Sequence, residues 1–129
     1  MTGDLEAVVR AMFDALDRND PEAALPLAAE DSQGIDELSR HWMRGRGELA
    51  DYMRQLMGMV KDVRSTMRDV HEVAWGEVGV VTFWLEQDYT IEGKRQHISA
   101  PSSVVLRREG DAWKIVLFHS IPLPEEQAG

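Results

Sequence analysis

The sequence predicts an α+β fold in which N-terminal helices cover one face of a long antiparallel β-sheet and enclose a pocket with it. Two observations favour this class. Residues 78–120 contain three strand-like runs separated by the hairpin-type turn pairs Glu92-Gly93 and Gly110-Asp111. The residues before them are dominated by apolar side chains at helical spacing. Helices that precede an antiparallel sheet can cover one of its faces, so we expect the pocket to lie between sheet and helices.

Three helices are expected before the sheet. The first carries one continuous apolar stripe, formed by Leu5, Val8, Val9, Met12, Phe13 and Leu16. A short second helix starts at Asp20-Pro21, runs to Glu30 and bends at Pro26. The third helix follows the glycine-rich turn at residues 45–47, and its apolar face is made of Leu49, Met53, Leu56, Met57 and Val60.

At least four strands are expected, with a fifth near residues 31–35. Residues 63–75 alternate in polarity, and we interpret the odd-numbered positions, which include His71, as the interior face. The strand 94–108 has one polar and one apolar face. The sequence leaves open which of these faces lines the pocket, because Pro101 can shift the alternation midway.

Composition narrows the classes of function. The chain of 129 residues fits one domain over 1–124, followed by a flexible tail at 125–129. A net charge of −9 disfavours binding to nucleic acids and to anionic membranes. The absence of cysteine excludes disulfides and thiolate catalysis. No signal peptide, membrane-spanning run, metal motif or nucleotide motif is recognisable, so we expect a cytoplasmic protein without metal or cofactor.

Three segments, taken in order, resemble the nuclear-transport-factor-2-like superfamily, also called SnoaL-like or cystatin-like. They are the opening LEAVVRAMFDALDRNDPEAALPLAAED, the helix start RGRGELADYM and the last strand GDAWKIVLFHS. The spacing in that strand places Trp113 and His119 on one face. The resemblance covers nearly the whole chain. It implies that the antiparallel β-sheet is curved and wrapped around the N-terminal helices, so that the fold is cone-shaped with an internal pocket. It does not imply one activity, because members include isomerases, polyketide cyclases, dehydratases, hydrolases and non-enzymatic association domains.

Comparison with the ketosteroid-isomerase branch of this superfamily assigns three positions. Asp36 falls where that branch keeps its proton-shuttling aspartate. Met12 falls at the oxyanion-hole tyrosine, and Ser103 falls at the second oxyanion donor. A methionine cannot donate a hydrogen bond, so the resemblance implies an incomplete oxyanion hole, and we do not expect a steroid isomerase of that mechanism.

The candidate catalytic residues are Asp36, His119 and His71. Asp36 would act as a general base if its carboxylate faces the pocket. His119 or His71 would be its acid–base partner, and Asp69 could pair with His71. The alternatives are a solvated loop carboxylate at position 36 and histidines that are bonded to the backbone in the core.

The candidate ligand-binding residues share apolar, aromatic or hydroxyl side chains, and they are Met12, Trp42, Met53, Trp84, Tyr89 and Ser103. Ordinary core or dimer packing is the alternative for the large ones. A homodimer is expected through the outer face of the sheet, with a surface that includes Val104, Leu106, Val116 and Phe118.

The expected function is binding of a small apolar molecule, such as a polyketide, a steroid or another carbonyl compound. Its catalytic form would be an acid–base isomerisation, cyclisation or dehydration without a cofactor, and the sequence does not decide whether the protein is an enzyme. The alternatives are a non-catalytic ligand-binding protein and a dimeric association domain with a vestigial pocket.

Overall fold

A computed structural model describes residues 3–124 and shows an α+β fold with three α-helices, one 3-10 turn and one sheet. The expected tail at 125–129 lies outside the described residues. The helical elements are α1 (Asp4–Asp17), α2 (Pro21–Ala24), the 3-10 turn Leu25–Leu27 and α3 (Arg46–Met59). The strands are β1 (Ala28–Asp36), β2 (Met43–Arg44), β3 (Val60–Trp75), β4 (Val78–Ile91), β5 (Lys94–Glu109) and β6 (Ala112–Ser120).

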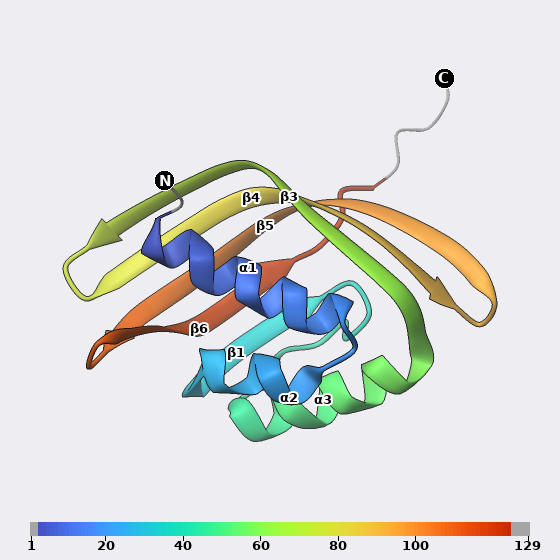
Figure 1. Ribbon diagram of the computed structural model, residues 1–129, viewed down its shortest axis with the longest axis horizontal. Helices are drawn as coiled ribbons and strands as arrows, with labels where there is room; N and C mark the ends of the chain where they lie inside the picture. Colours follow the sequence, from blue (N-terminus) through green and yellow to red (C-terminus); the bar gives the residue numbers. More distant parts are fainter. Residues whose placement is uncertain (1–2, 125–129) are drawn as a thin grey trace.

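The six strands form one sheet in the order β2-β1-β6-β5-β4-β3. Every neighbouring pair is antiparallel except β1 and β6, which run parallel. Figure 1 shows the sheet curving around the helices, with α1 lying across the concave face and α2 and α3 gathered near β1. The fold class expected from the sequence is therefore confirmed. The helices described for residues 3–124 are too short or too polar to span a bilayer.

The segment after α1 differs from the expected second helix. In the structure, α2 ends at Ala24, and Pro26 falls in the short 3-10 turn that follows. The chain then becomes the nine-residue strand β1, which starts at Ala28 and pairs with β6. The prediction that this helix extends to Glu30 was wrong, because the pairing of β1 with β6 outweighs the helical propensity of the alanines.

The core lies between α1 and the concave face of the sheet. The buried side chains of α1 pack on those of β4, β5 and β6, among them Val81, Val104, Leu106 and Ile115. Val104 and Leu106 are 0% exposed, and Phe118 packs against the same core. These residues cannot form a dimer surface, so that part of the expectation was wrong; the homodimer itself stays a prediction.

Two of the register shifts in the sheet decide where the expected histidines lie. Asp69 has a φ of 53°, and the β3–β4 register shifts between Arg68 and His71. The strand therefore points Val70 toward the core instead of His71. The β5–β6 register shifts between Val105 and Leu106. Strict alternation along β6 would place Trp113 and His119 on the same face. Because of the shift, Trp113 packs against the core, whereas His119 lies on the opposite face of the sheet.

The strand β5 keeps its alternation through Pro101. Its register with β4 is continuous from Lys94 to Arg107. The even-numbered, mostly apolar residues face inward, as the complete burial of Ala100 and Val104 shows. The question that the sequence left open is answered in favour of the apolar face.

Replacing Gly79 with alanine is expected to lower the free energy of unfolding by about 1–3 kcal/mol, since overpacking strains a filled core. An added Cβ would lie 2.7 Å and 2.9 Å from the two Cδ atoms of Leu5 and 3.2 Å from the Val73 carbonyl oxygen. Gly58 is the control. A Cβ there meets nothing within 4 Å, so alanine in this helix is expected to stabilise by about 0.5–1 kcal/mol. Equal effects in urea denaturation would contradict the packing described for Gly79.

Candidate functional site

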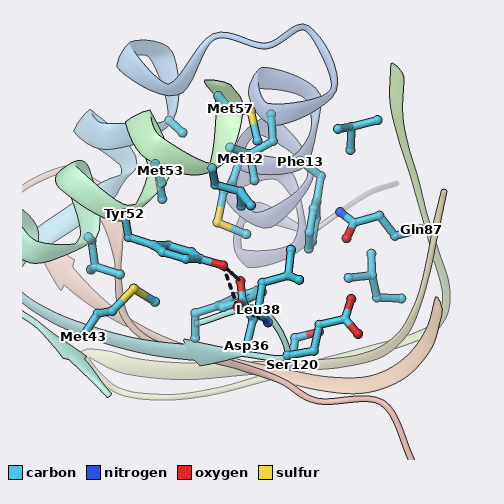
Figure 2. Close-up of a pocket in the computed structure, with 18 of the residues that line it drawn as sticks. Met12, Phe13, Asp36, Leu38, Met43, Tyr52, Met53, Met57, Gln87 and Ser120 are labelled. Atoms are coloured by element: carbon cyan, nitrogen blue, oxygen red, sulfur yellow. Dashed lines mark hydrogen bonds between the residues drawn. The ribbon is translucent and has the colours of Figure 1, made fainter. Parts of the chain in front are cut away.

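A cavity of about 110 Å³ lies between α1, α3 and the concave face of the sheet. Its wall is mostly apolar, with four methionines (Met12, Met43, Met53 and Met57). Phe13 and Phe118 add aromatic rings. The turn after β1 forms the mouth, where Leu38 lines the cavity and is 37% exposed. Figure 2 shows the methionines of α1 and α3 on one side and Asp36 with Ser120 on the other.

Asp36 is the polar centre of this cavity. It ends β1, and its Oδ1 accepts hydrogen bonds from the backbone amides of Leu38 (3.0 Å) and Ser39 (2.8 Å). The hydroxyl of Tyr52 reaches across from α3 and donates to Oδ1 at 2.7 Å and to Oδ2 at 3.0 Å (Figure 2). The carboxylate is thus fixed by the turn on one side and a phenol on the other. Its Oδ2 keeps the greater share of free lone pairs.

A second carboxyl–phenol pair stands beside the first. The Tyr89 hydroxyl donates to Oε1 of Glu37 at 2.9 Å, and both residues line the cavity. Burial raises the pKa of Glu37, and the charge of Asp36 adds to this, against the opposing hydrogen bond from Tyr89. Burial and the neighbouring carboxylates also raise the pKa of Tyr52 and of Tyr89. Both phenols therefore keep their protons at neutral pH and act as donors.

The size of the cavity limits its occupant. Ligand sites typically enclose about 300–1,000 Å³, whereas an apolar cavity of about 150 Å³ suffices for benzene. A volume of about 110 Å³ is smaller than that, so the cavity as it stands suits a short aliphatic chain, and a molecule of one ring fits only if side chains of the wall move. The methionine side chains can adopt other rotamers, so they allow some growth of this space.

Four of the expected site residues line the cavity: Asp36, Met12, Met53 and Tyr89. Met12 stands in the wall where the isomerase comparison placed a tyrosine, and it supplies no hydrogen-bond donor there. Met12 and Met53, for which the sequence left cavity lining and ordinary core packing both open, form part of this apolar wall. The roles assigned to these residues stay predictions.

The two expected histidines lie elsewhere. The side chain of His71 is 74% exposed and pairs with Asp69 at 3.3 Å. His119 lies on the outer side of β6, where its ring is 6.5 Å from that of Trp42, which is itself 39% exposed. Neither histidine lines the cavity, and Trp42, expected among the ligand-binding residues, does not line it either. The expected interior positions of the histidines were wrong because the bulges in β3 and β6 reverse the side-chain alternation.

Trp84 and Ser103 also face away from the cavity. Trp84 lies on the convex side of β4, with the Arg68 guanidinium 5.2 Å from its ring centre. Ser103 pairs with Thr82 on the same side, while the neighbouring Ser102 is buried and bonds to Ser120 at 2.8 Å. The expectation that Trp84 and Ser103 line the pocket was wrong, because each of them lies one position away from residues of its strand that face inward.

Sequence reasoning missed Tyr52, Glu37, Gln87 and Ser120, all of which line the cavity. Two of them carry a signal in the sequence. Tyr52 follows Leu49 by three positions and precedes Leu56 by four, so it shares their helix face. Gln87 stands between Leu85 and Tyr89 in the alternation of β4, which places it on the interior side.

Across residues 3–124, no group of three or more His, Asp or Glu side chains is placed to hold a metal ion. Lysine, arginine and histidine are all absent from the residues that line the cavity. Its titratable side chains are the two carboxyls and the two phenols. The arrangement can accept protons or hydrogen bonds at Asp36 and Glu37 within an otherwise apolar space.

Comparison with known proteins agrees with this fold. The family model for the SnoaL-like domain matches residues 5–124. No curated protein matches the sequence. Solved structures that share the fold belong to NTF2-like, cystatin-like and ketosteroid-isomerase-like proteins.

Three of these structures illustrate the range of names within the fold. A candidate dehydratase of the NTF2-like family from Streptomyces avermitilis is 20% identical, with a TM-score of 0.83 over 95% of this chain and 96% of that one. A ketosteroid isomerase-like protein from Erwinia carotovora atroseptica is 18% identical, with a TM-score of 0.81 over 95% of both chains. A candidate calcium/calmodulin-dependent protein kinase type II association domain from Thiobacillus denitrificans is 24% identical, with a TM-score of 0.76 over 92% and 94%. Likeness at these identities concerns the fold alone.

Proposed function

The chain belongs to the SnoaL-like domain family, and from this premise we propose that it binds a small apolar molecule in the cavity beside Asp36. The observation that carries the proposal is the apolar cavity with the fixed carboxylate–phenol pair of Asp36 and Tyr52 in its wall, next to the pair of Glu37 and Tyr89. Placing an ionised group against apolar surface is costly unless hydrogen bonds compensate it. Three donors compensate it here, which is the pattern of a polar anchor inside an apolar binding site.

Acid–base catalysis at Asp36 is the second candidate function. Oδ2 could take a proton from a carbon of the ligand and return it to another carbon, which would make the reaction an isomerisation. Tyr52 would hold the carboxylate in position. Binding ranks first because the two positions nearest to the expected oxyanion donors offer none: Met12 has no donor, and the Tyr52 proton is already bound to Asp36.

The binding proposal is tested by adding toluene to protein labelled with ¹³C at the methionine methyl groups. The four cavity methionines are expected to shift with a common, saturable dependence on toluene, because their methyl groups surround the ligand. Met59, which is 50% exposed, is the internal control and should not follow them. No saturable shift, or an equal shift at Met59, would contradict binding in the cavity.

The catalytic candidate is tested by deuterium exchange at the carbon next to the carbonyl of cyclopentanone in D₂O. If Asp36 is a base, the wild-type protein accelerates this exchange and Asp36→Asn abolishes the acceleration, while Tyr52→Phe reduces it. Equal rates for the wild-type protein and Asp36→Asn would rule out the base and leave the binding function untouched.

A further inference from the structure

The charges around the cavity all have one sign. Two carboxyls, Asp36 and Glu37, line it, and no cationic side chain among the described residues does. The charge of Asp36 is one of the causes that raise the pKa of Glu37, so the two groups act on each other through a weakly screened space. This inference rests on the proposed function, since it concerns the ligand of the same cavity.

The open polar positions at this end of the cavity are acceptors. The hydroxyls of Tyr52 and Tyr89 already donate to the two carboxyls. Gln87 donates to the Ser65 hydroxyl at 3.0 Å. Oδ2 of Asp36 accepts only the longer of the two hydrogen bonds from the Tyr52 hydroxyl, at 3.0 Å. Oε2 of Glu37 accepts no hydrogen bond from residues 3–124. A ligand that donates hydrogen bonds therefore finds two carboxylate oxygens here, whereas the two phenol protons are not free for a ligand that accepts them.

We propose that the cavity selects a small apolar amine in its protonated form, with the ammonium group on the carboxylates of Asp36 and Glu37 and the apolar part among the methionines. An ammonium group supplies several N–H donors and one positive charge, which match the two open oxygens. The aromatic rings of Phe13 and Phe118 in the wall add a surface that attracts cations. The cavity volume limits the apolar part to about one ring.

The same arrangement disfavours acids. A carboxylate ligand would be buried beside Asp36 and Glu37 without a cationic partner, at a large desolvation cost. The net charge of −9 acts in the same direction before contact, because it raises the local concentration of cations and repels anions. Selection by charge is thus expected both on approach and in the cavity.

Four one-ring compounds of similar size test this proposal: benzylamine, benzyl alcohol, toluene and benzoate, titrated against the wild-type protein at neutral pH. Benzylamine is expected to bind at least tenfold more tightly than toluene, and benzoate more weakly than toluene. Benzyl alcohol, a neutral donor, should fall between benzylamine and toluene. Benzoate binding as tightly as benzylamine would overturn the proposal.

Two double variants locate the cause. Asp36→Asn with Glu37→Gln is expected to reduce the ratio of benzylamine to toluene affinity, measured within that variant, to about one. The control, Glu77→Gln with Asp111→Asn, removes the same formal charge from exposed turns and should keep the wild-type ratio. A ratio that falls equally in both variants would assign the preference to overall charge and contradict a site at Asp36 and Glu37.

The titrations separate the two proposals. If toluene and the other three compounds all fail to bind, the proposed binding function is wrong. If toluene binds in the cavity and benzylamine binds no more tightly, only the preference for an ammonium group is wrong.

Discussion

Replacing Phe13 with alanine is expected to lower the free energy of unfolding by about 3–5 kcal/mol, the range for removal of a buried aromatic side chain. Phe13 is 4% exposed and joins the core to the cavity. Its ring meets Phe83 at 5.8 Å and Phe118 at 6.2 Å between centroids, both in edge-to-face geometry. Alanine removes both ring pairs and leaves a void next to the existing cavity, where the surrounding helix and strands have little freedom to close it.

Urea denaturation of the wild-type protein, Phe13→Ala and Phe13→Leu measures this effect. The leucine side chain refills most of the volume but lacks the aromatic edges. Phe13→Leu should therefore lower the free energy of unfolding by less than half as much as Phe13→Ala does. The enlarged cavity of Phe13→Ala should also bind bulkier ligands than the wild-type protein does. A loss for Phe13→Ala below about 1 kcal/mol, the range of surface substitutions, would contradict its place in the core.

Replacing Asp36 with alanine is expected to lower the free energy of unfolding by about 2–3 kcal/mol, because it leaves three hydrogen-bond donors without their charged acceptor. These donors are the amides of Leu38 and Ser39 and the hydroxyl of Tyr52. The turn after β1 would lose its fixed geometry, and with it the shape of the cavity mouth. Thermal or urea denaturation measures the loss.

Asp36→Asn is the matched control for this prediction. The amide oxygen of asparagine can still accept from the backbone and from Tyr52, so the cost should fall to about 1 kcal/mol, the net value of an uncharged hydrogen bond. A double-mutant cycle with Tyr52→Phe isolates the contribution of the phenol. Additive losses in Asp36→Ala and Tyr52→Phe would show that the two side chains do not interact, against the contacts described here.

Much of the fold follows from short-range patterns. The apolar stripe of α1 and the turns at Gly93 and Gly110, both with positive φ, are local features, and local features are readable from one sequence. Strand β1 was harder to predict, because its nine residues contain few strand formers. It exists through pairing with β6, a contact between residues far apart in the chain.

The site was predictable only in part, for a related reason. A single extra residue in a strand reverses every side chain beyond it, so the bulge at Asp69 was enough to move His71 from the interior to the surface. The position of Asp36 survived because it ends a strand next to the cavity. The importance of Tyr52 came from a contact between α3 and β1 that no local pattern specifies.

The most direct test of the binding function is a crystal structure of the protein soaked with toluene. We predict electron density for one ring inside the cavity, in contact with Met12 and Phe13 and on the side of Tyr52 that faces Asp36. Toluene located only on the outer surface, with the methionine side chains filling the cavity, would contradict the proposed function.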